Sequence, residues 1–78
     1  MSILAVSGRD VIRILTKAGF KKAGAKGSHI HLQKVLGGKT LHVTVPAHQN
    51  KDLNTFVLHA IARQAGYTFE EFVQLFRN

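Results

Sequence analysis

The sequence predicts an α+β fold in which one helix precedes three antiparallel strands and two helices follow them. Apolar residues recur at helical spacing near residues 11–18 and in two later segments, whereas residues 28–45 alternate between apolar and polar side chains. A domain this small buries only about 60% of its unfolded surface, so the core is modest. We therefore expect one domain, residues 1–78, whose helices cover one face of a three-stranded sheet.

The first helix is predicted to start after Ser7, because Ser7 and Asp10 form a capping box that satisfies free backbone N–H groups. An apolar face follows at helical spacing, formed by Val11, Ile14, Leu15 and Ala18. Gly19 is expected to end the helix, since glycine tolerates the left-handed conformation that a helix C-terminus requires. A second, basic face carries three cations spaced four residues apart, namely Arg9, Arg13 and Lys17.

Two strands are predicted to form a hairpin around Gly37-Gly38, because both glycines can adopt a positive φ. A short, basic edge strand over residues 20–26 is expected to precede them. A two-residue turn pairs Leu36 with Lys39, and this register gives one apolar face formed by Ile30, Leu32, Val43 and Val45. The opposite, polar face then carries three histidines, which are His29, His31 and His42, with His48 just beyond the hairpin.

Pro46 cannot extend a strand ladder and is expected to end the last strand. After a polar loop, a helix is predicted over about residues 54–65, ended by Gly66, with an inward face of Val57, Leu58, Ile61 and Ala65. Thr68 and Glu71 belong to a second capping box. A short terminal helix follows it, and its apolar side chains are Phe69, Phe72, Val73 and Phe76.

The chain is strongly basic, with 11 Lys and Arg residues against 4 Asp and Glu residues. The cations concentrate in the first half, where Asp10 is the single acid, whereas Glu70 and Glu71 lie near the end. A cationic surface built from the first helix and the strands favours a nucleic-acid partner, because it attracts phosphate polyanions. The alternative is a solvated surface that keeps the protein in solution and has no other role.

Several classes of protein are excluded by composition. The absence of cysteine excludes disulfides and thiolate metal sites and is consistent with a reducing compartment. Apolar residues make up 45% of the chain, too many for a disordered basic tail. No apolar run approaches the length of a membrane span, and Met1–Val6 lacks the basic start and the length of a signal peptide. We therefore expect a cytoplasmic protein with no membrane contact.

His29 begins the first hairpin strand, directly after the basic turn Lys26-Gly27-Ser28. Histidine titrates near neutral pH, so it can accept or donate a proton in the cleavage of RNA. Lys26, together with Lys21 and Lys22 on the neighbouring strand, is placed to stabilise charge on phosphate. The candidates for holding the RNA backbone are Arg9, Arg13 and Lys17. The residues alone leave open an ordinary surface histidine on a half-exposed strand.

A zinc site is a second interpretation of the same face, since His29, His31 and His42 alternate on neighbouring strands. The lack of a carboxylate beside them, which would complete or orient the ligands, disfavours it. Ser28 is not expected to be a nucleophile, because nothing in the sequence places a base and an acid beside it. The roles of His31, His42 and His48 stay open.

Several short motifs occur in an order that is informative as a set. The first helix ends in Lys17-Ala18-Gly19-Phe20, and Gly27-Ser28-His29 follows. Further along stand Val45-Pro46-Ala47-His48, Asn50-Lys51-Asp52-Leu53, Arg63-Gln64-Ala65-Gly66 and Glu70-Glu71-Phe72. From about residue 7 to residue 75 the chain resembles the HicA family, also called YcfA-like proteins. These are small toxins of bacterial and archaeal toxin–antitoxin systems.

The resemblance implies a double-stranded-RNA-binding-domain-like fold and an mRNA interferase, an RNase that stops translation by cutting messages. It implies that His29 is the catalytic residue, that no metal cofactor takes part, and that a HicB-type antitoxin covers this surface. We therefore expect RNA to be bound by the residues around His29 and by the first helix, namely Lys21, Lys22, Lys26, Ser28, Arg9, Arg13 and Lys17.

The chain departs from the family pattern in its second long helix. Thr55-Phe56-Val57 stands where the family usually has a Pro-Gly-Thr step, and His59 replaces a residue that is commonly basic. Two alternatives to a HicA-like endoribonuclease stay open. One is a non-catalytic RNA-binding module of the same fold, which binds RNA with steep salt dependence and leaves it intact. The other is an interaction protein whose charge binds an acidic partner.

Overall fold

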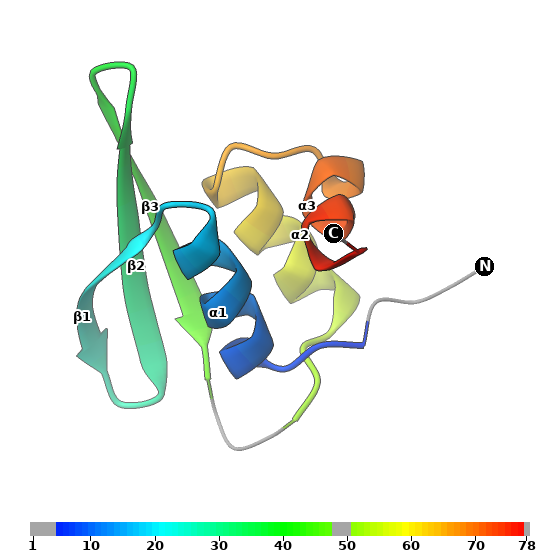
Figure 1. The fold of residues 1–78 in the computed structure, drawn as a ribbon. Helices are drawn as coiled ribbons and strands as arrows, with labels where there is room; N and C mark the ends of the chain where they lie inside the picture. Colours follow the sequence, from blue (N-terminus) through cyan, green and yellow to red (C-terminus); the bar gives the residue numbers. More distant parts are fainter. Residues whose placement is uncertain (1–4, 48–50, 78) are drawn as a thin grey trace.

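In the computed structural model, which describes residues 5–47 and 51–77, the helices lie on one side of a three-stranded antiparallel sheet (Figure 1). In chain order the elements are α1 (Gly8–Lys17), β1 (Lys21–Lys26), β2 (His29–Leu36), β3 (Lys39–Pro46), α2 (Thr55–Gln64) and α3 (Phe69–Arg77). The predicted α+β fold is confirmed. His48, for which no role was predicted, lies outside the described residues.

The β2–β3 hairpin has the predicted register. Gly37 and Gly38 form its turn with φ angles of 59° and 80°, which residues with a side chain rarely adopt. Leu36 pairs with Lys39, and the pairing continues to the end of the hairpin. The tip of this ribbon projects beyond the helices (Figure 1), and Val35 and Leu36 are exposed there. Closer to its base, one face of the hairpin packs on the helices and the other carries the histidines.

β1 is an edge strand of the sheet, as predicted, and it contains a bulge. Lys22 pairs with Leu32 and Gly24 pairs with His31, so Ala23 is an extra residue between the two pairs. A bulge interrupts the alternation of an unbroken strand. It therefore decides which face of the sheet each lysine of β1 occupies.

The core lies between the sheet and the helices. Its largest side chains are Phe20 and Phe72, with exposed fractions of 1% and 0%. The buried apolar side chains are Val6, Val11, Leu15, Phe20, Leu32, Val43, Val45, Leu58, Ile61, Ala62, Ala65 and Phe72. They include residues from all three helices and from β2 and β3, so one cluster holds the helical layer on the sheet.

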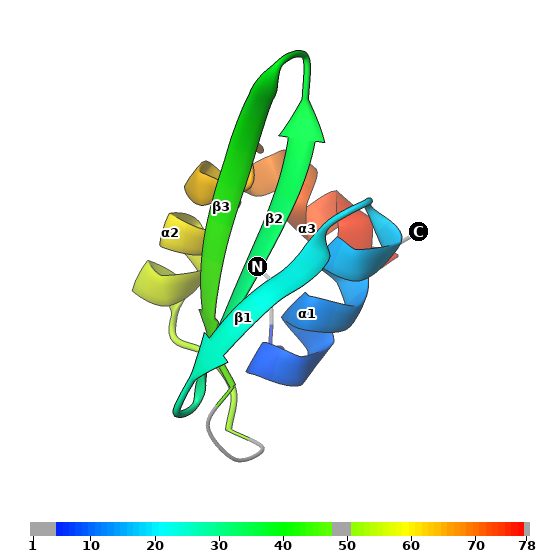
Figure 2. The same ribbon diagram turned by 90° about the vertical axis from the view of Figure 1, so that its left-hand side faces the viewer.

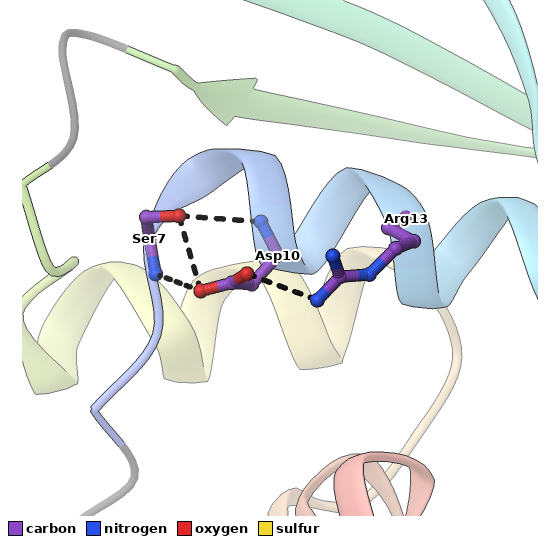
Figure 3. Close-up of polar contacts among 3 residues, drawn as sticks. All are labelled: Ser7, Asp10 and Arg13. Carbon is purple, nitrogen blue, oxygen red and sulfur yellow. Dashed lines mark hydrogen bonds and ion pairs between the residues drawn. The ribbon is translucent and has the colours of Figure 1, made fainter.

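The N-terminus of α1 carries the predicted capping box (Figure 3). The Asp10 carboxylate accepts a hydrogen bond from the Ser7 backbone N–H at 3.0 Å, and the Ser7 hydroxyl accepts one from the Asp10 N–H at 3.3 Å. Arg13 donates to the other carboxylate oxygen at 3.1 Å. These groups lower the pKa of Asp10, the hydrogen bonds from Ser7 contributing most and Arg13 adding a smaller effect.

Replacing Asp10 with asparagine is expected to destabilise the protein at neutral pH but not in strong acid. Because the folded state has the lower pKa, the ionised carboxylate stabilises the fold fully above its unfolded pKa of about 3.8. That contribution is lost as the pH falls through the lower folded pKa. Thermal melts of the parent and Asp10→Asn are expected to differ at pH 7 and to converge once the pH is below the lowered pKa of Asp10 in the folded state. A difference that stays constant with pH would contradict the assignment.

The C-terminus of α1 is fixed by a lysine from the sheet. Lys34 Nζ donates a hydrogen bond to the Ala18 carbonyl oxygen at 2.7 Å and lies 5.7 Å from the centre of the Phe20 ring. Gly19 follows with a φ of 106°, as expected for a glycine that ends a helix. The charge of Lys34 therefore neutralises the exposed carbonyl end of α1 and is not free for a ligand.

The N-terminus of α1 packs against the end of β3. A Cβ atom on Gly8 would lie 2.2 Å from the Pro46 carbonyl oxygen, so no larger residue fits there without a shift of the backbone. The Ala47 N–H donates to the Ser28 carbonyl oxygen at 2.7 Å and holds the same end of the sheet together. Because Pro46 pairs with His29, the first turn of α1 lies at the His29 end of the sheet.

Candidate functional site

Figure 2 shows the side of the sheet that no helix of the described residues covers. Cross-strand pairs share a face, so the side chains on this side form three rows that cross all three strands, followed by the Val35–Thr40 pair near the hairpin tip. The rows are Lys26–His29–Pro46, Gly24–His31–Thr44 and Lys21–Gln33–His42. Successive rows are about 7 Å apart, since a strand rises about 3.3 Å per residue. We call this surface the histidine face.

His29 lies in the row nearest the β1–β2 turn, and its side chain is exposed. Gly27, with a φ of 60°, allows the chain to reverse directly before it. Lys26 is its cross-strand partner, at a Cα separation of about 5 Å. Within residues 5–47 and 51–77, Lys26 forms no ion pair with a carboxylate. A proton-exchanging group and an unneutralised cation therefore stand side by side.

The charge of the sheet is entirely of one sign. Residues 20–46 contain five lysines and three histidines but no aspartate or glutamate. Lys22, Lys34 and Lys39 pair with leucines on the other side of the sheet, which leaves Lys21 and Lys26 as the lysines on the histidine face. An exposed surface of this kind attracts phosphate from a distance and has no carboxylate to repel it.

The middle row contains an open space beside a fixed imidazole. His31 is half-buried, and its Nδ1 atom lies 3.1 Å from the Thr44 hydroxyl oxygen. On the other side of His31 stands Gly24, where an added Cβ atom would meet nothing within 4 Å. The face is therefore open over Gly24, between the rows that hold Lys26 and Lys21.

The two other predicted lysines of β1 lie further from His29. Lys21 is in the third row, about 13 Å along the sheet from the row of His29. It lines a shallow depression of about 300 Å³ together with Gly19, Gln33, Lys34 and Val35. Lys22 pairs with Leu32, so its side chain belongs to the helix-facing side of β1. The structure thus brings Lys26 to His29, but not Lys22.

Helix α1, which carries the other three predicted cations, lies on the helical side of the sheet, behind it in the view of Figure 2. Arg9 follows Gly8 and is therefore at the His29 end of the molecule. Arg13 is bonded to Asp10 at 3.1 Å. Lys17 is at the opposite end of α1, where it lines a small cavity of about 210 Å³ with Leu75 of α3. Of the three cations, Arg9 alone lies at the His29 end of the sheet.

The alternative zinc site gains no support from the geometry. Among the described residues, no three His, Cys, Asp or Glu side chains are close enough together to hold a metal ion. His29 and His42 share a face, but they stand in the first and third rows. The hairpin places the three histidines on one surface, but not close enough together to bind one metal ion.

Two features of the histidine face were missed in the sequence. Gly24 received no role, although a glycine inside a strand often marks a bulge or an open surface. Thr44 received no role either, and its contact with His31 was not predicted. The register pairs these two residues directly, so a cross-strand Thr–His hydrogen bond was a detectable signal.

The family model described as "HicA toxin of bacterial toxin-antitoxin" matches residues 8–67, which run from the start of α1 past the end of α2 and contain the whole histidine face. The chain belongs to the HicA toxin family. The predicted resemblance is thereby confirmed, and this HicA protein is the toxin of a toxin–antitoxin system, which implies an antitoxin partner. A comparison with curated proteins gives no match. None of the helices in the described part of this HicA chain is long and apolar enough to cross a membrane.

Proposed function

We propose that this HicA-family toxin is a cytoplasmic endoribonuclease that cleaves mRNA by histidine acid–base catalysis and so inhibits translation. The observation that carries the proposal is the exposed His29 beside Lys26, on a sheet that holds no carboxylate. His29 supplies the proton transfer, and Lys26 stabilises the charge that develops on the scissile phosphate.

RNA cleavage of this kind needs only side chains of the protein and the 2′-hydroxyl of the substrate. A base removes the proton of the ribose 2′-hydroxyl, whose oxygen attacks the adjacent phosphorus. The bond from phosphorus to the 5′-oxygen breaks, and an acid donates a proton to that oxygen. The products are a 2′,3′-cyclic phosphate and a free 5′-hydroxyl. His29 performs one of the two proton transfers, and no metal ion or other cofactor enters the scheme.

The RNA backbone is proposed to cross the open space over Gly24, with phosphates near Lys26 and Lys21. Ser28 and Arg9, both at the His29 end, are proposed to contact it there. Three further cations lie away from this path, namely Arg13, Lys17 and Lys22. We propose that they attract the RNA polyanion at long range and do not contact it at the cleavage site.

Incubation of the purified protein with RNA and with DNA of the same sequence, in EDTA, tests the proposal. RNA is expected to be cut to products with cyclic phosphate ends, whereas DNA stays intact because it lacks the 2′-hydroxyl. RNA that is bound with steep salt dependence but not cut would instead establish the non-catalytic binding module. Cleavage of both polymers would exclude a 2′-hydroxyl nucleophile.

A HicB-type antitoxin is proposed to neutralise the toxin by covering the histidine face. Val35 supports this placement, because it pairs with Thr40 on the same side of the hairpin and is 70% exposed. Equimolar cognate antitoxin is expected to abolish RNA cleavage. A complex that forms and still cleaves at the parent rate would place the antitoxin elsewhere.

Filling the open space over Gly24 is expected to block cleavage without harming the fold. Gly24 does not have a positive φ, and a Cβ atom there has no neighbour within 4 Å, so Gly24→Leu fits the strand. The leucine side chain would occupy the proposed RNA path beside His31. We expect at least a tenfold loss of cleavage rate with an unchanged or higher melting temperature, since glycine weakens a strand by ~0.5–1 kcal/mol. Retention of full activity would move the RNA path elsewhere.

A further inference from the structure

We infer that His31 is the second proton-transfer residue of the site and acts together with His29. The inference rests on the proposed ribonuclease function and names the group that completes it. Cleavage needs both a base for the 2′-hydroxyl and an acid for the 5′-oxygen, and one histidine cannot serve both within a single bond-breaking step.

The position of His31 relative to His29 fits this role. The two residues alternate on β2, so their side chains leave the same face about 7 Å apart. Each ring nitrogen reaches a further ~2.6–3.2 Å to a hydrogen-bond partner. Two imidazoles at this spacing can therefore contact the attacking and leaving oxygens of one phosphodiester. The charge between those oxygens falls close to Lys26, the cross-strand partner of His29.

The contact with Thr44 fits a residue that exchanges protons at its other nitrogen. With Nδ1 of His31 at 3.1 Å from the Thr44 hydroxyl oxygen, an Nδ1–H can donate to that oxygen in both the neutral and the charged ring. Nε2 is then the nitrogen that gains or loses the proton. Thr44 also fixes the plane of the ring, so it is a positioning residue.

The space around His31 admits a substrate. Its cross-strand partner on β1 is Gly24, and an added Cβ atom there would meet no atom within 4 Å. Gly24 itself therefore has no side chain that could cover that side of the imidazole. His42, by contrast, stands in the third row, about 13 Å along the sheet from the row of His29. Of the described histidines on this face, His31 is the one in the row next to His29.

The test compares His29→Ala, His31→Ala and the matched control His42→Ala in single-turnover cleavage. His31→Ala is expected to lose at least ~10²-fold in rate, whereas His42→Ala stays near the parent. The parent's pH–rate profile is expected to be bell-shaped, and each active-site variant to retain one limb of it. Thermal melts check that the variants are folded.

A second substrate shows which of His29 and His31 is the acid and which is the base. In RNA with sulfur in place of the 5′-bridging oxygen at the mapped cleavage site, the leaving thiolate needs no proton, because a thiol has a pKa of about 8.5. This RNA is expected to rescue cleavage by one of the two alanine variants and not by the other. Rescue of neither or of both would overturn the pairing of His31 with His29.

The outcomes separate this inference from the proposed function. If the parent cleaves RNA and His31→Ala cleaves at the parent rate, the inference fails and the ribonuclease assignment stands. If the parent leaves RNA intact, the proposed function itself fails. Thr44→Val is expected to shift the limb of the pH–rate profile that His31 contributes. Thr44→Ser keeps the hydroxyl and is expected to give the same profile as the parent. A Thr44→Val profile identical to the parent's would remove the positioning role.

Discussion

His29→Ala is expected to lower the rate of RNA cleavage by about 10²–10⁴-fold, the usual contribution of a positioned acid or base. The substitution removes an exposed side chain and leaves the buried core untouched. The free energy of unfolding is therefore expected to change by less than ~0.5 kcal/mol, as for other surface substitutions. Loss of activity without loss of stability is the signature of a group that performs chemistry.

The measurement is a single-turnover rate together with a thermal melt, for His29→Ala and for His42→Ala. The two histidines lie on the same face and both are exposed, so they differ mainly in their distance from Lys26. Free imidazole added to His29→Ala is expected to restore part of the rate, because the vacated position is open to solvent. Equal losses in both variants would indicate a general effect of charge on RNA binding.

The hairpin register could be predicted because every signal that fixes it is local. Gly37 and Gly38 set the turn, and alternation then decides the face of each following residue. The same is true of the capping box at Ser7 and Asp10, whose two residues are three positions apart. The placement of His29 on the uncovered face follows from these short-range rules alone.

The arrangement of the cations could not be predicted, because it depends on contacts between distant segments. The bulge at Ala23 places Lys22 on the helix-facing side of β1, and Gly24 indicates only that a bulge can form there, not which residue is the extra one. In the sequence, Lys34 is one more basic residue with no visible partner. Only the packing of α1 on the sheet brings its Nζ atom to the Ala18 carbonyl oxygen. The basic stripe along α1 was predicted correctly from the helical spacing of its residues. Its distance from His29 was not, because tertiary packing sets that distance.

The terminal helix α3 shows how local pattern and packing combine. The matched family span ends at residue 67, so α3 lies beyond it. Nevertheless Phe72 is fully buried and belongs to the same core as Leu32 and Val43 of the sheet. Its ring meets Phe76 edge-on, with 5.3 Å between centroids, and Phe69 lies 6.4 Å away. α3 is therefore part of the structure that holds the histidine face.

Phe72→Ala is accordingly expected to lower the free energy of unfolding by about 3–5 kcal/mol, the usual cost of emptying a buried phenylalanine site. For a domain of this size that corresponds to a fall in melting temperature of roughly 12 °C or more. The matched control is Phe56→Ala, since the Phe56 ring is 88% exposed and its loss creates no cavity. Chemical denaturation of both variants measures the difference. Similar destabilisation by the two substitutions would mean that α3 does not pack into the core, and the helical layer that supports the sheet would then end with α2.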